Sequence, residues 1–313
     1  MITMEMLRER IIATNTWKDI ADVLEFNISP EALAAEVSTK SENDWIVWKA
    51  FVDGSISSNR LRDKLHRHPF PDITRLGVYS DDSLEYHVGG GLANAIQITS
   101  KADKHGHPFE SASKVLDFGC GTSRILRYMV EFMPGPQYYG SEVFSENIKW
   151  GRSAFPEVTY IQHGNYPPLE IRDCAFDIIY AYSIFTHYEE KLHLQWLSEL
   201  ERLLKPEGLL ILTVHGKKIL DRCKDEQYIR RTMCIEGRDY EELCNKFNDY
   251  GYVFYRCYDP KHLERGGLNA GVFGITYISK EYIRKNWSNK FHVLEHDEGA
   301  VSNWHDYVIM KKS

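Results

Sequence analysis

The chain of 313 residues is long enough to bury one large core and still carry an additional segment. Its 45 Asp and Glu residues outnumber its 38 Lys and Arg residues, which gives a formal net charge of −7 at pH 7. Because no block of basic residues offsets this acidity, the composition disfavours duplex DNA or RNA as a partner. These properties predict one α/β domain with an extension, and no nucleic-acid surface.

The cysteines and the first residues indicate a soluble protein of a reducing compartment. The six cysteines are scattered without a Cys-x-x-Cys pair, so neither a zinc site nor a disulfide framework is expected. Residues 1–10 are charged and do not resemble a leader peptide, and no apolar run approaches the roughly 18 residues that a membrane span needs. We therefore expect a cytoplasmic protein that holds no metal and does not associate with membranes.

Residues 1–80 are predicted to form a helical N-terminal extension. The segment Ser29-Pro30-Glu31 is typical of a helix start, because serine caps the helix, proline suits its first turn and the acid lies at the positive end of the helix dipole. Further along, helical spacing puts Trp45, Trp48 and Val52 on one face. Such a face is usually buried, so we expect it to pack against the main domain.

The segment 114–124, which reads KVLDFGCGTSR, is the most informative part of the chain. Its first residues are mostly apolar, as in a buried parallel strand. Gly119 and Gly121 then allow the backbone to turn sharply and to approach a ligand closely. Arg124 stands where dinucleotide-binding proteins have a third glycine over a pyrophosphate. The segment therefore predicts a strand, loop and helix around a ligand that lacks phosphates.

From residue 114 onward, predicted strands alternate with helices. After the first strand, the apolar pattern predicts strands at 138–143, 158–162, 176–182 and 209–214, and a helix through 192–204. This repetition indicates a parallel sheet with helices on both faces. Ligands of such sheets bind at the carboxyl ends of the strands, where the loops that follow the strands are located.

The alternation stops at residues 217–275, a polar stretch that is rich in Tyr, Arg and Cys. Because a long insertion in a compact domain is more often functional than slack, we interpret it as a lid on the substrate side. A helix that Ser279 caps is expected next, followed by two strands at 291–296 and 305–312 that pair as an antiparallel hairpin.

The string VLDFGCG at 115–121 resembles the first motif of the class I S-adenosylmethionine (SAM)-dependent methyltransferases, with Ser123 in place of the motif's last glycine. The resemblance covers about residues 85–313 and is strongest from 114 to 216, which places the predicted SAM-binding domain at residues 81–313. It implies a Rossmann-like sheet that is mostly parallel with an antiparallel last strand. It also implies SAM as cofactor and S-adenosylhomocysteine (SAH) as product. Asp117 would lie near the methionine end of SAM, against the backbone of Gly119, Cys120 and Gly121.

Two further positions follow from the same resemblance. Glu142 and Val143 match the family's segment at the end of the second strand, and a carboxylate there can accept hydrogen bonds from both ribose hydroxyls. Asn165 corresponds to the residue near the adenine amino group. The run Asn165-Tyr166-Pro167-Pro168 does not match the Asn-Pro-Pro-Tyr signature of adenine and glutamine N-methyltransferases, so methylation of that type is disfavoured.

The segment from Phe176 to His187 resembles the stretch that brings the family's fourth strand to the active site. It puts Tyr182 near the sulfonium, which an aromatic ring can face by a cation–π contact. It also makes His187 a candidate general base, because a neutral imidazole can take a proton from an alcohol or amine. His215, at the end of the fifth predicted strand, is the second candidate.

The sequence thus predicts SAM-dependent methyl transfer to the oxygen or nitrogen of a small-molecule or sugar-like acceptor. Two other hypotheses remain open at this point. A SAM-binding module without catalysis would keep Asp117, Gly119 and Glu142 yet transfer nothing. A nicotinamide-dependent dehydrogenase would share the early strands and the ribose acid, although the third glycine of its fingerprint is missing.

Overall fold

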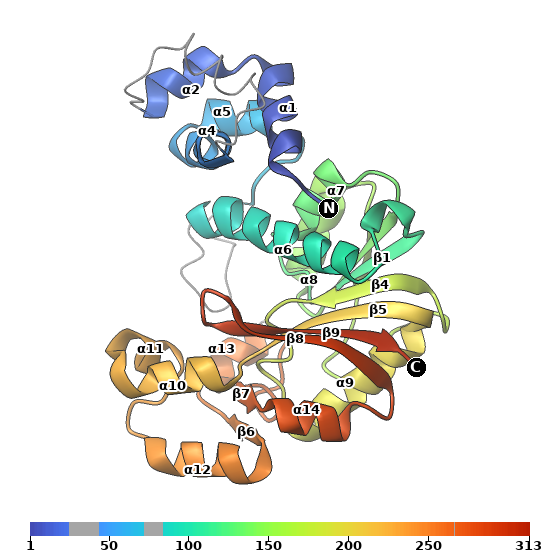
Figure 1. Ribbon diagram of the computed structural model, residues 1–313, viewed down its shortest axis with the longest axis vertical. Helices are drawn as coiled ribbons and strands as arrows, with labels where there is room; N and C mark the ends of the chain where they lie inside the picture. Colours follow the sequence, from blue (N-terminus) through green and yellow to red (C-terminus); the bar gives the residue numbers. More distant parts are fainter. Residues whose placement is uncertain (25–43, 72–83, 266) are drawn as a thin grey trace.

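The computed structural model describes residues 1–24, 44–71, 84–265 and 267–313, and it is built around one seven-stranded sheet (Figure 1). The helix start expected at Ser29-Pro30-Glu31 lies outside the described residues. The strand order is β3-β2-β1-β4-β5-β9-β8. The strands are β1 (Lys114–Phe118), β2 (Gln137–Glu142), β3 (Thr159–Gln162), β4 (Phe176–Ala181), β5 (Leu204–Val214), β8 (Phe291–Val301) and β9 (His305–Lys312).

The strand directions confirm the predicted fold class. Strands β1 to β5 run parallel to their neighbours, whereas β9 is antiparallel to both β5 and β8. The last strand is therefore the antiparallel one, as expected, and it forms the predicted hairpin with β8. Because β2 and β4 lie on opposite sides of β1, the strand order reverses there, and the carboxyl end of β1 opens a crevice for a ligand.

Alternating side chains of the strands supply two hydrophobic cores, one on each face of the sheet. Val115 and Ile178 belong to one core, and their chain neighbours Leu116 and Ile179 belong to the other. The first core is covered by α6 (Gly91–Lys104), α7 (Leu126–Phe132) and α8 (Ser145–Ala154), and the second by α9 (Glu190–Leu203) and α14 (Lys280–Asn286) (Figure 1). Burial on both faces explains why the central strands β1 and β4 and the second half of β5 are mostly apolar.

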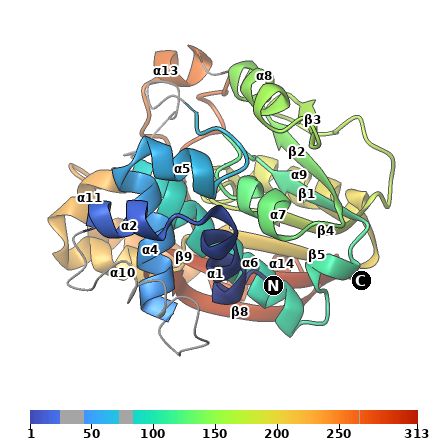
Figure 2. The same ribbon diagram turned by 90° about the horizontal axis from the view of Figure 1, so that it is seen from above.

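The described part of the N-terminal extension consists of α1 (Met4–Thr14), α2 (Trp17–Leu24), α4 (Asp44–Ser57) and α5 (Asn59–Leu65). Figure 2 shows α1, α4 and α5 lying over α6, with α7 beside them. The prediction that Trp45, Trp48 and Val52 share one buried face of α4 is only partly correct. Val52 is buried in the first core and Trp48 is half-buried against it, but Trp45 is 64% exposed. Trp45 lies in the first turn of α4, outside the buried face, with the Lys49 ammonium 5.8 Å from its ring centroid.

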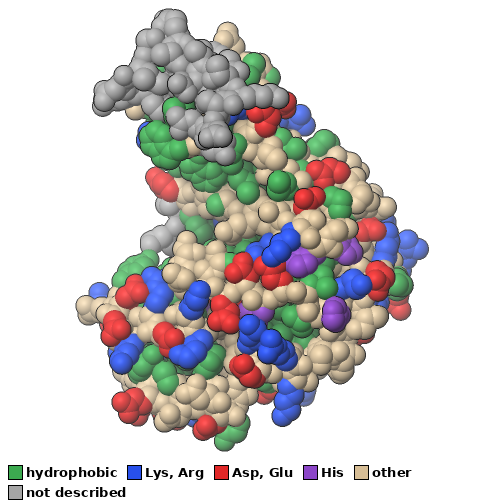
Figure 3. Space-filling view, viewed as in Figure 1, with side chains coloured by type: hydrophobic (Ala, Val, Ile, Leu, Met, Phe, Trp, Pro, Cys, Tyr) green, Lys and Arg blue, Asp and Glu red, His purple; other side chains and the backbone are tan. Residues whose placement is uncertain are grey.

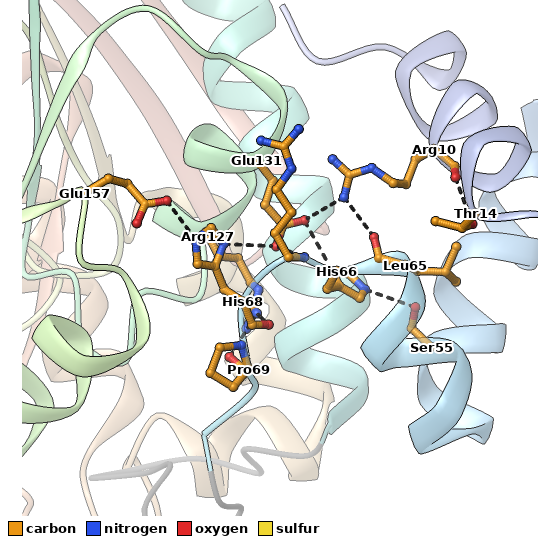
Figure 4. Close-up of polar contacts among 11 residues, drawn as sticks. Arg10, Thr14, Ser55, Leu65, His66, His68, Pro69, Arg127, Glu131 and Glu157 are labelled. Carbon is orange, nitrogen blue, oxygen red and sulfur yellow. Dashed lines mark hydrogen bonds and ion pairs between the residues drawn. The ribbon is translucent and has the colours of Figure 1, made fainter.

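A buried carboxylate joins the extension to the sheet domain (Figure 4). Glu131 of α7 accepts a hydrogen bond from the Arg67 backbone N–H at 3.2 Å, and its Oε1 lies 3.4 Å from His68 Nδ1. Its Oε2 lies 3.6 Å from His66 Nδ1 and 3.7 Å from Arg10. Burial by itself would raise the pKa of Glu131, but these imidazoles and the nearby Arg127 hold it far below its usual range. The carboxylate is therefore ionised and surrounded by donors from the extension.

Arg127, one turn before Glu131, completes this connection. Its side chain is fully buried and donates to the backbone carbonyls of His68 at 2.7 Å and Pro69 at 3.1 Å. The guanidinium carbon also lies 3.5 Å from the centroid of the Phe70 ring. Two charged side chains of α7 thus hold residues 66–70, which lead from α5 toward the sheet domain.

The insertion at 217–275, for which the sequence predicts no regular strand and helix alternation, folds around a small core of its own. Its elements are α10 (Lys217–Asp225), α11 (Gln227–Thr232), α12 (Tyr240–Tyr250), β6 (Tyr252–Tyr255), α13 (Pro260–Arg265) and β7 (Ile275–Ile278), with β6 and β7 antiparallel. Its surface alternates in charge through pairs such as Lys217 with Asp221 and Arg222 with Glu226 (Figure 3). The β7 strand connects this body to the sheet domain, because Thr276 N–H donates to the Thr186 carbonyl.

Two short irregular turns complete the described chain, the π-helical η2 (Tyr86–Gly90) before α6 and the 3-10 turn η3 (Phe109–Ser111) before β1. In the described ranges, no helix combines the length and the apolar character that crossing a bilayer would require.

Replacing Glu131 by Gln is expected to destabilise the protein by about 3 to 5 kcal/mol, because the buried cations around it lose their counter-charge. The matched control is Glu157→Gln, since the half-exposed Glu157 also contacts His68, at 2.7 Å, and should cost under about 1 kcal/mol. Urea unfolding followed by circular dichroism measures both changes. Equal effects of the two substitutions would contradict the role given to Glu131.

Candidate active site

The turn after β1 forms the floor of the site. Gly119 and Gly121 have φ angles of +76° and +53°, which favour glycine. A Cβ on Gly119 would also overlap the side chain of Ile184. The backbone N–H groups of Gly119 and Cys120 both donate to the Ser141 carbonyl at the end of β2, at 2.9 and 3.0 Å. The turn is thus fixed against β2, with its backbone facing the crevice.

A cavity of about 270 Å³, the first cavity, opens above this turn at the carboxyl ends of β1, β2 and β4. The structure brings most of the predicted site residues together here. Those that line the first cavity are Asp117, Gly119, Cys120, Gly121, Glu142, Val143, Tyr182 and His187. Asn165 and His215 do not line it.

Glu142 is buried, and the backbone holds its carboxylate in place. Oε2 accepts from the Gly121 N–H at 2.8 Å, and Oε1 accepts from the N–H groups of Val143 at 2.7 Å and Phe144 at 3.1 Å. Burial raises the pKa of Glu142, while these three hydrogen bonds act in the opposite direction. The carboxylate therefore connects the turn after β1 to the end of β2, and its remaining acceptor capacity faces the cavity.

Asp117 is also buried, at 3% exposure, at the end of β1. Burial is the main reason that the pKa of Asp117 rises to about 8, with a smaller contribution from Glu142, whereas the Tyr180 hydroxyl and, to a lesser extent, the guanidinium of Arg124 oppose the rise. The Arg124 guanidinium carbon lies 4.0 Å from the Tyr86 ring centroid and 5.2 Å from that of Tyr182. Two buried carboxyls with one nearby cation give the first cavity a preference for a positively charged ligand.

Asn165, the predicted adenine contact, is directed toward the insertion. Its Nδ2 donates to the Gly267 carbonyl at 2.8 Å, and its Oδ1 accepts from the Asn269 N–H at 2.9 Å. Asn165 thereby holds the loop at 267–269 instead of lining the cavity. His163, two residues earlier, lines the cavity and stacks on Phe118 at 5.4 Å between ring centroids. The sequence analysis missed His163, although it immediately follows the third strand.

A second cavity of about 1140 Å³ adjoins the first and shares Tyr86, Tyr182, Ser183 and His187 with it. Ser183 has a φ of +58°, an uncommon value for a residue other than glycine, and its N–H donates to Thr213 Oγ1 at 2.7 Å. Ser183 thus forms a tight turn at the end of β4, at the place where the two cavities adjoin. The outer walls of the second cavity come from α6, α11 and the β8–β9 hairpin.

Both predicted base candidates and one further histidine line the second cavity. The ring centroids of His187 and His215 are 6.4 Å apart, and those of His215 and His305 are 5.0 Å apart in a stacked arrangement. The sequence analysis missed His305. It begins β9, and because β9 is antiparallel to β5 with Asp306 opposite Val214, its first residue reaches the same edge as the carboxyl ends of the parallel strands.

Hydrogen bonds to backbone carbonyls define the tautomers of two of these rings. His187 Nδ1 donates to the Gly274 carbonyl at 2.8 Å, and His215 Nδ1 donates to the Thr276 carbonyl at 3.2 Å. Because a carbonyl only accepts, Nε2 of each ring carries the lone pair. Burial lowers the pKa of His187 to about 4 and that of His305 to about 3, and it lowers the pKa of His215 well below its usual value. All three imidazoles are therefore neutral at physiological pH.

Among the residues that the structure describes, no three His, Cys, Asp or Glu side chains come together as metal ligands would. The described site thus combines a first cavity that contains two buried carboxyl groups with a second cavity that contains neutral bases, and the two cavities share His187.

Residues 116–212 match a family model described as a methyltransferase domain. The trans-aconitate 2-methyltransferase of Azoarcus sp. (strain BH72) is 28% identical over 109 residues, which are 34% of this chain and 40% of that protein. The match thus spans less than half the length of this curated relative.

Two solved structures are similar over most of their length. The PH0226 protein from Pyrococcus horikoshii OT3 has a TM-score of 0.49 at 18% identity, covering 78% of this chain and 100% of that chain. The magnesium protoporphyrin IX methyltransferase from Synechocystis PCC 6803, solved with bound SAH, has a TM-score of 0.47 at 14% identity, covering 75% of this chain and 91% of that chain.

The raised pKa of Asp117 predicts a pH-dependent stability of the protein in the absence of ligand. The folded value of about 8 lies above the value of about 3.9 for an unfolded chain, so folding favours the protonated carboxyl. Its contribution is fully present below the unfolded pKa and is lost as the pH rises through the folded one. Relative to Asp117→Asn, the free energy of unfolding should fall by about 1.4 kcal/mol per pH unit between these two values. Urea unfolding over this pH range measures the difference, and a constant difference would contradict the assignment.

Proposed function

We propose that this protein transfers the methyl group of SAM to the oxygen or nitrogen of a small-molecule acceptor, because residues 116–212 match a family model described as a methyltransferase domain. One observation carries the proposal. The first cavity, with its glycine turn and two buried carboxyls, adjoins a larger second cavity and shares Tyr182, Ser183 and His187 with it. A donor and an acceptor bound in the two cavities would meet at this junction.

The residues of the first cavity suit SAM in their charge and their hydrogen-bonding groups. Glu142 is held by three backbone N–H groups and keeps acceptor capacity for the two ribose hydroxyls. Asp117 supplies a carboxylate for the ammonium of the methionine end, and a cationic ligand would favour its ionised form. The positive-φ turn at Gly119, Cys120 and Gly121 provides close backbone contact. The turn fits a ligand without phosphates, because Arg124 stands in place of the third glycine.

His163, stacked on Phe118, is better situated for an adenine contact than Asn165. The case for Tyr182 as the partner of the sulfonium is weaker than the sequence suggested, because the Arg124 guanidinium already lies 5.2 Å from its ring centroid. Tyr182 still lines both cavities, so its ring is a wall of the junction.

When bound, SAM supplies a methyl carbon that the acceptor attacks, and the electron pair of the broken C–S bond stays on sulfur to leave neutral SAH. The protein contributes alignment of the acceptor and removal of its proton. We propose that Nε2 of His187 accepts this proton, because the ring lines both cavities and its Nδ1–H already donates to the Gly274 carbonyl. His215 is the second candidate for the base, although it lines only the second cavity and not the first.

SAH is expected to bind to the protein, and Glu142→Ala should weaken the binding by roughly 1 to 3 kcal/mol because two ribose hydroxyls lose their acceptor. Isothermal titration calorimetry measures both affinities. Glu146→Ala is the matched control, since Glu146 begins the next helix and lies outside the first cavity. A folded wild-type protein that gives no heat with SAM or SAH would disprove the proposed function.

Replacing His187 by Ala should leave SAH affinity nearly unchanged and reduce methyl transfer about 10²- to 10⁴-fold, because a base acts in the transition state. His292→Ala, at an exposed position of β8, is the control. Since the pKa of His187 is about 4, turnover should not fall with an inflection near the unperturbed histidine value of about 6.5. Transfer from methyl-labelled SAM, measured against pH, provides the readout, and full activity of His187→Ala would exclude this residue as the base.

A further inference from the structure

The second cavity has no charged wall among the residues that the structure describes. None of its described lining residues is Asp, Glu, Lys or Arg, and its three histidines are neutral at physiological pH. Two guanidinium groups pack on rings of its wall. That of Arg124, which lines the first cavity, lies against the Tyr86 and Tyr182 rings, and that of Arg222, which is paired with Glu226, lies 5.7 Å from the Trp304 ring centroid. Because neither guanidinium lines the second cavity, a carboxylate or phosphate bound there would lose its hydration without contacting a counter-charge, which costs several kcal/mol.

Rings form much of the wall instead. Tyr86 and Tyr182 stand at the junction with the first cavity, Tyr258 lies beside His187 at 6.1 Å between ring centroids, and Trp304 closes the far side from the β8–β9 turn. Met233 and Ile275 add apolar surface. Aromatic and apolar walls of this kind favour a flat, ring-containing ligand, because offset or edge contacts between rings add to the burial of apolar surface.

Two polar atoms in the wall are buried without a hydrogen-bond partner. Gln97 Nε2 donates to the Ala300 carbonyl at 3.3 Å, but its Oε1 is unpartnered. His305 Nδ1 is likewise unpartnered, although its Nε2 lies 3.3 Å from Ser183 Oγ. A buried carbonyl oxygen without a donor is costly, and a ligand hydroxyl or N–H group would satisfy it.

We propose that the second cavity takes an uncharged, ring-containing acceptor that carries a hydroxyl group, in the manner of a neutral phenol, and that it rejects polycarboxylates. This inference rests on the proposed function, because it identifies the acceptor of the same reaction. The hydroxyl oxygen forms the new bond to the methyl carbon, and its proton goes to Nε2 of His187, so the positive charge passes from the sulfonium to the imidazolium. The chain would then differ in acceptor class from its relative that methylates trans-aconitate.

The test compares matched pairs of ligands that differ by one charge. With the protein saturated with SAH, binding of methyl 4-hydroxybenzoate and of 4-hydroxybenzoate is measured by ligand-observed NMR, together with several other neutral phenols and their carboxylated counterparts, and with trans-aconitate. In each pair that binds, we expect the neutral phenol to bind at least about tenfold more tightly than its carboxylated counterpart, which corresponds to about 1.4 kcal/mol of binding free energy. Equal or tighter binding of the anionic members, binding of trans-aconitate, or no binding of any neutral phenol at low millimolar concentration would overturn the inference.

Two variants assign the binding to this cavity. Ala93→Phe fills the space beside α6 and should weaken the binding of the neutral phenols about tenfold or more while SAH still binds. Gln97→Leu removes the unpartnered carbonyl and should weaken by a similar factor the binding of those phenols that carry a second hydrogen-bond donor. Ala13→Phe, on the exposed side of α1, is the control and should change neither affinity. If SAH binds and the phenols are insensitive to both variants, the inference is wrong and the proposed function stands. If SAH itself does not bind, the proposed function fails first.

Discussion

Two carboxyl groups are buried side by side along the sheet edge, at the ends of β1 and β2, and the rest of the site depends on how the protein tolerates them. Glu142 is accommodated by three backbone N–H groups, one of them from the glycine turn that follows β1. Asp117 has less compensation, and burial raises its pKa to about 8. Buried charges that lack partners are unfavourable in the folded protein, so these two acids favour a ligand that brings positive charge. SAM carries both an ammonium and a sulfonium.

The remaining parts of the molecule are arranged around this edge. The tight turn at Ser183 directs β4 past the first cavity, and the antiparallel β9 brings His305 to the same edge. The insertion contributes through the backbone of β7 and the residue before it, since the carbonyls of Gly274 and Thr276 set the tautomers of His187 and His215. The insertion at 217–275, which the sequence analysis interpreted as a lid, therefore orients the two candidate bases. The N-terminal extension is attached from the opposite side through Glu131 and Arg127 of α7, the helix that follows the glycine turn (Figure 4).

Local sequence patterns predicted the sheet and most of the first cavity, because strands, turns and their glycines leave signals within a few residues. The segment 114–124 alone indicated the strand and the glycine turn that follows it. Features that depend on distant contacts were not predictable in this way. Trp45 and Asn165 were expected in buried or ligand-facing positions, yet Trp45 is exposed and Asn165 bonds to a loop about a hundred residues away. His305 was missed because its place follows from strand register and not from a motif.

The most direct test of this account is a crystal structure of the protein with SAH. We expect SAH in the first cavity, with its ribose hydroxyls within hydrogen-bonding distance of Glu142, its amino group beside Asp117 and its sulfur directed toward His187 and the second cavity. SAH bound elsewhere on the molecule, or in the first cavity with its ribose away from Glu142, would contradict the account.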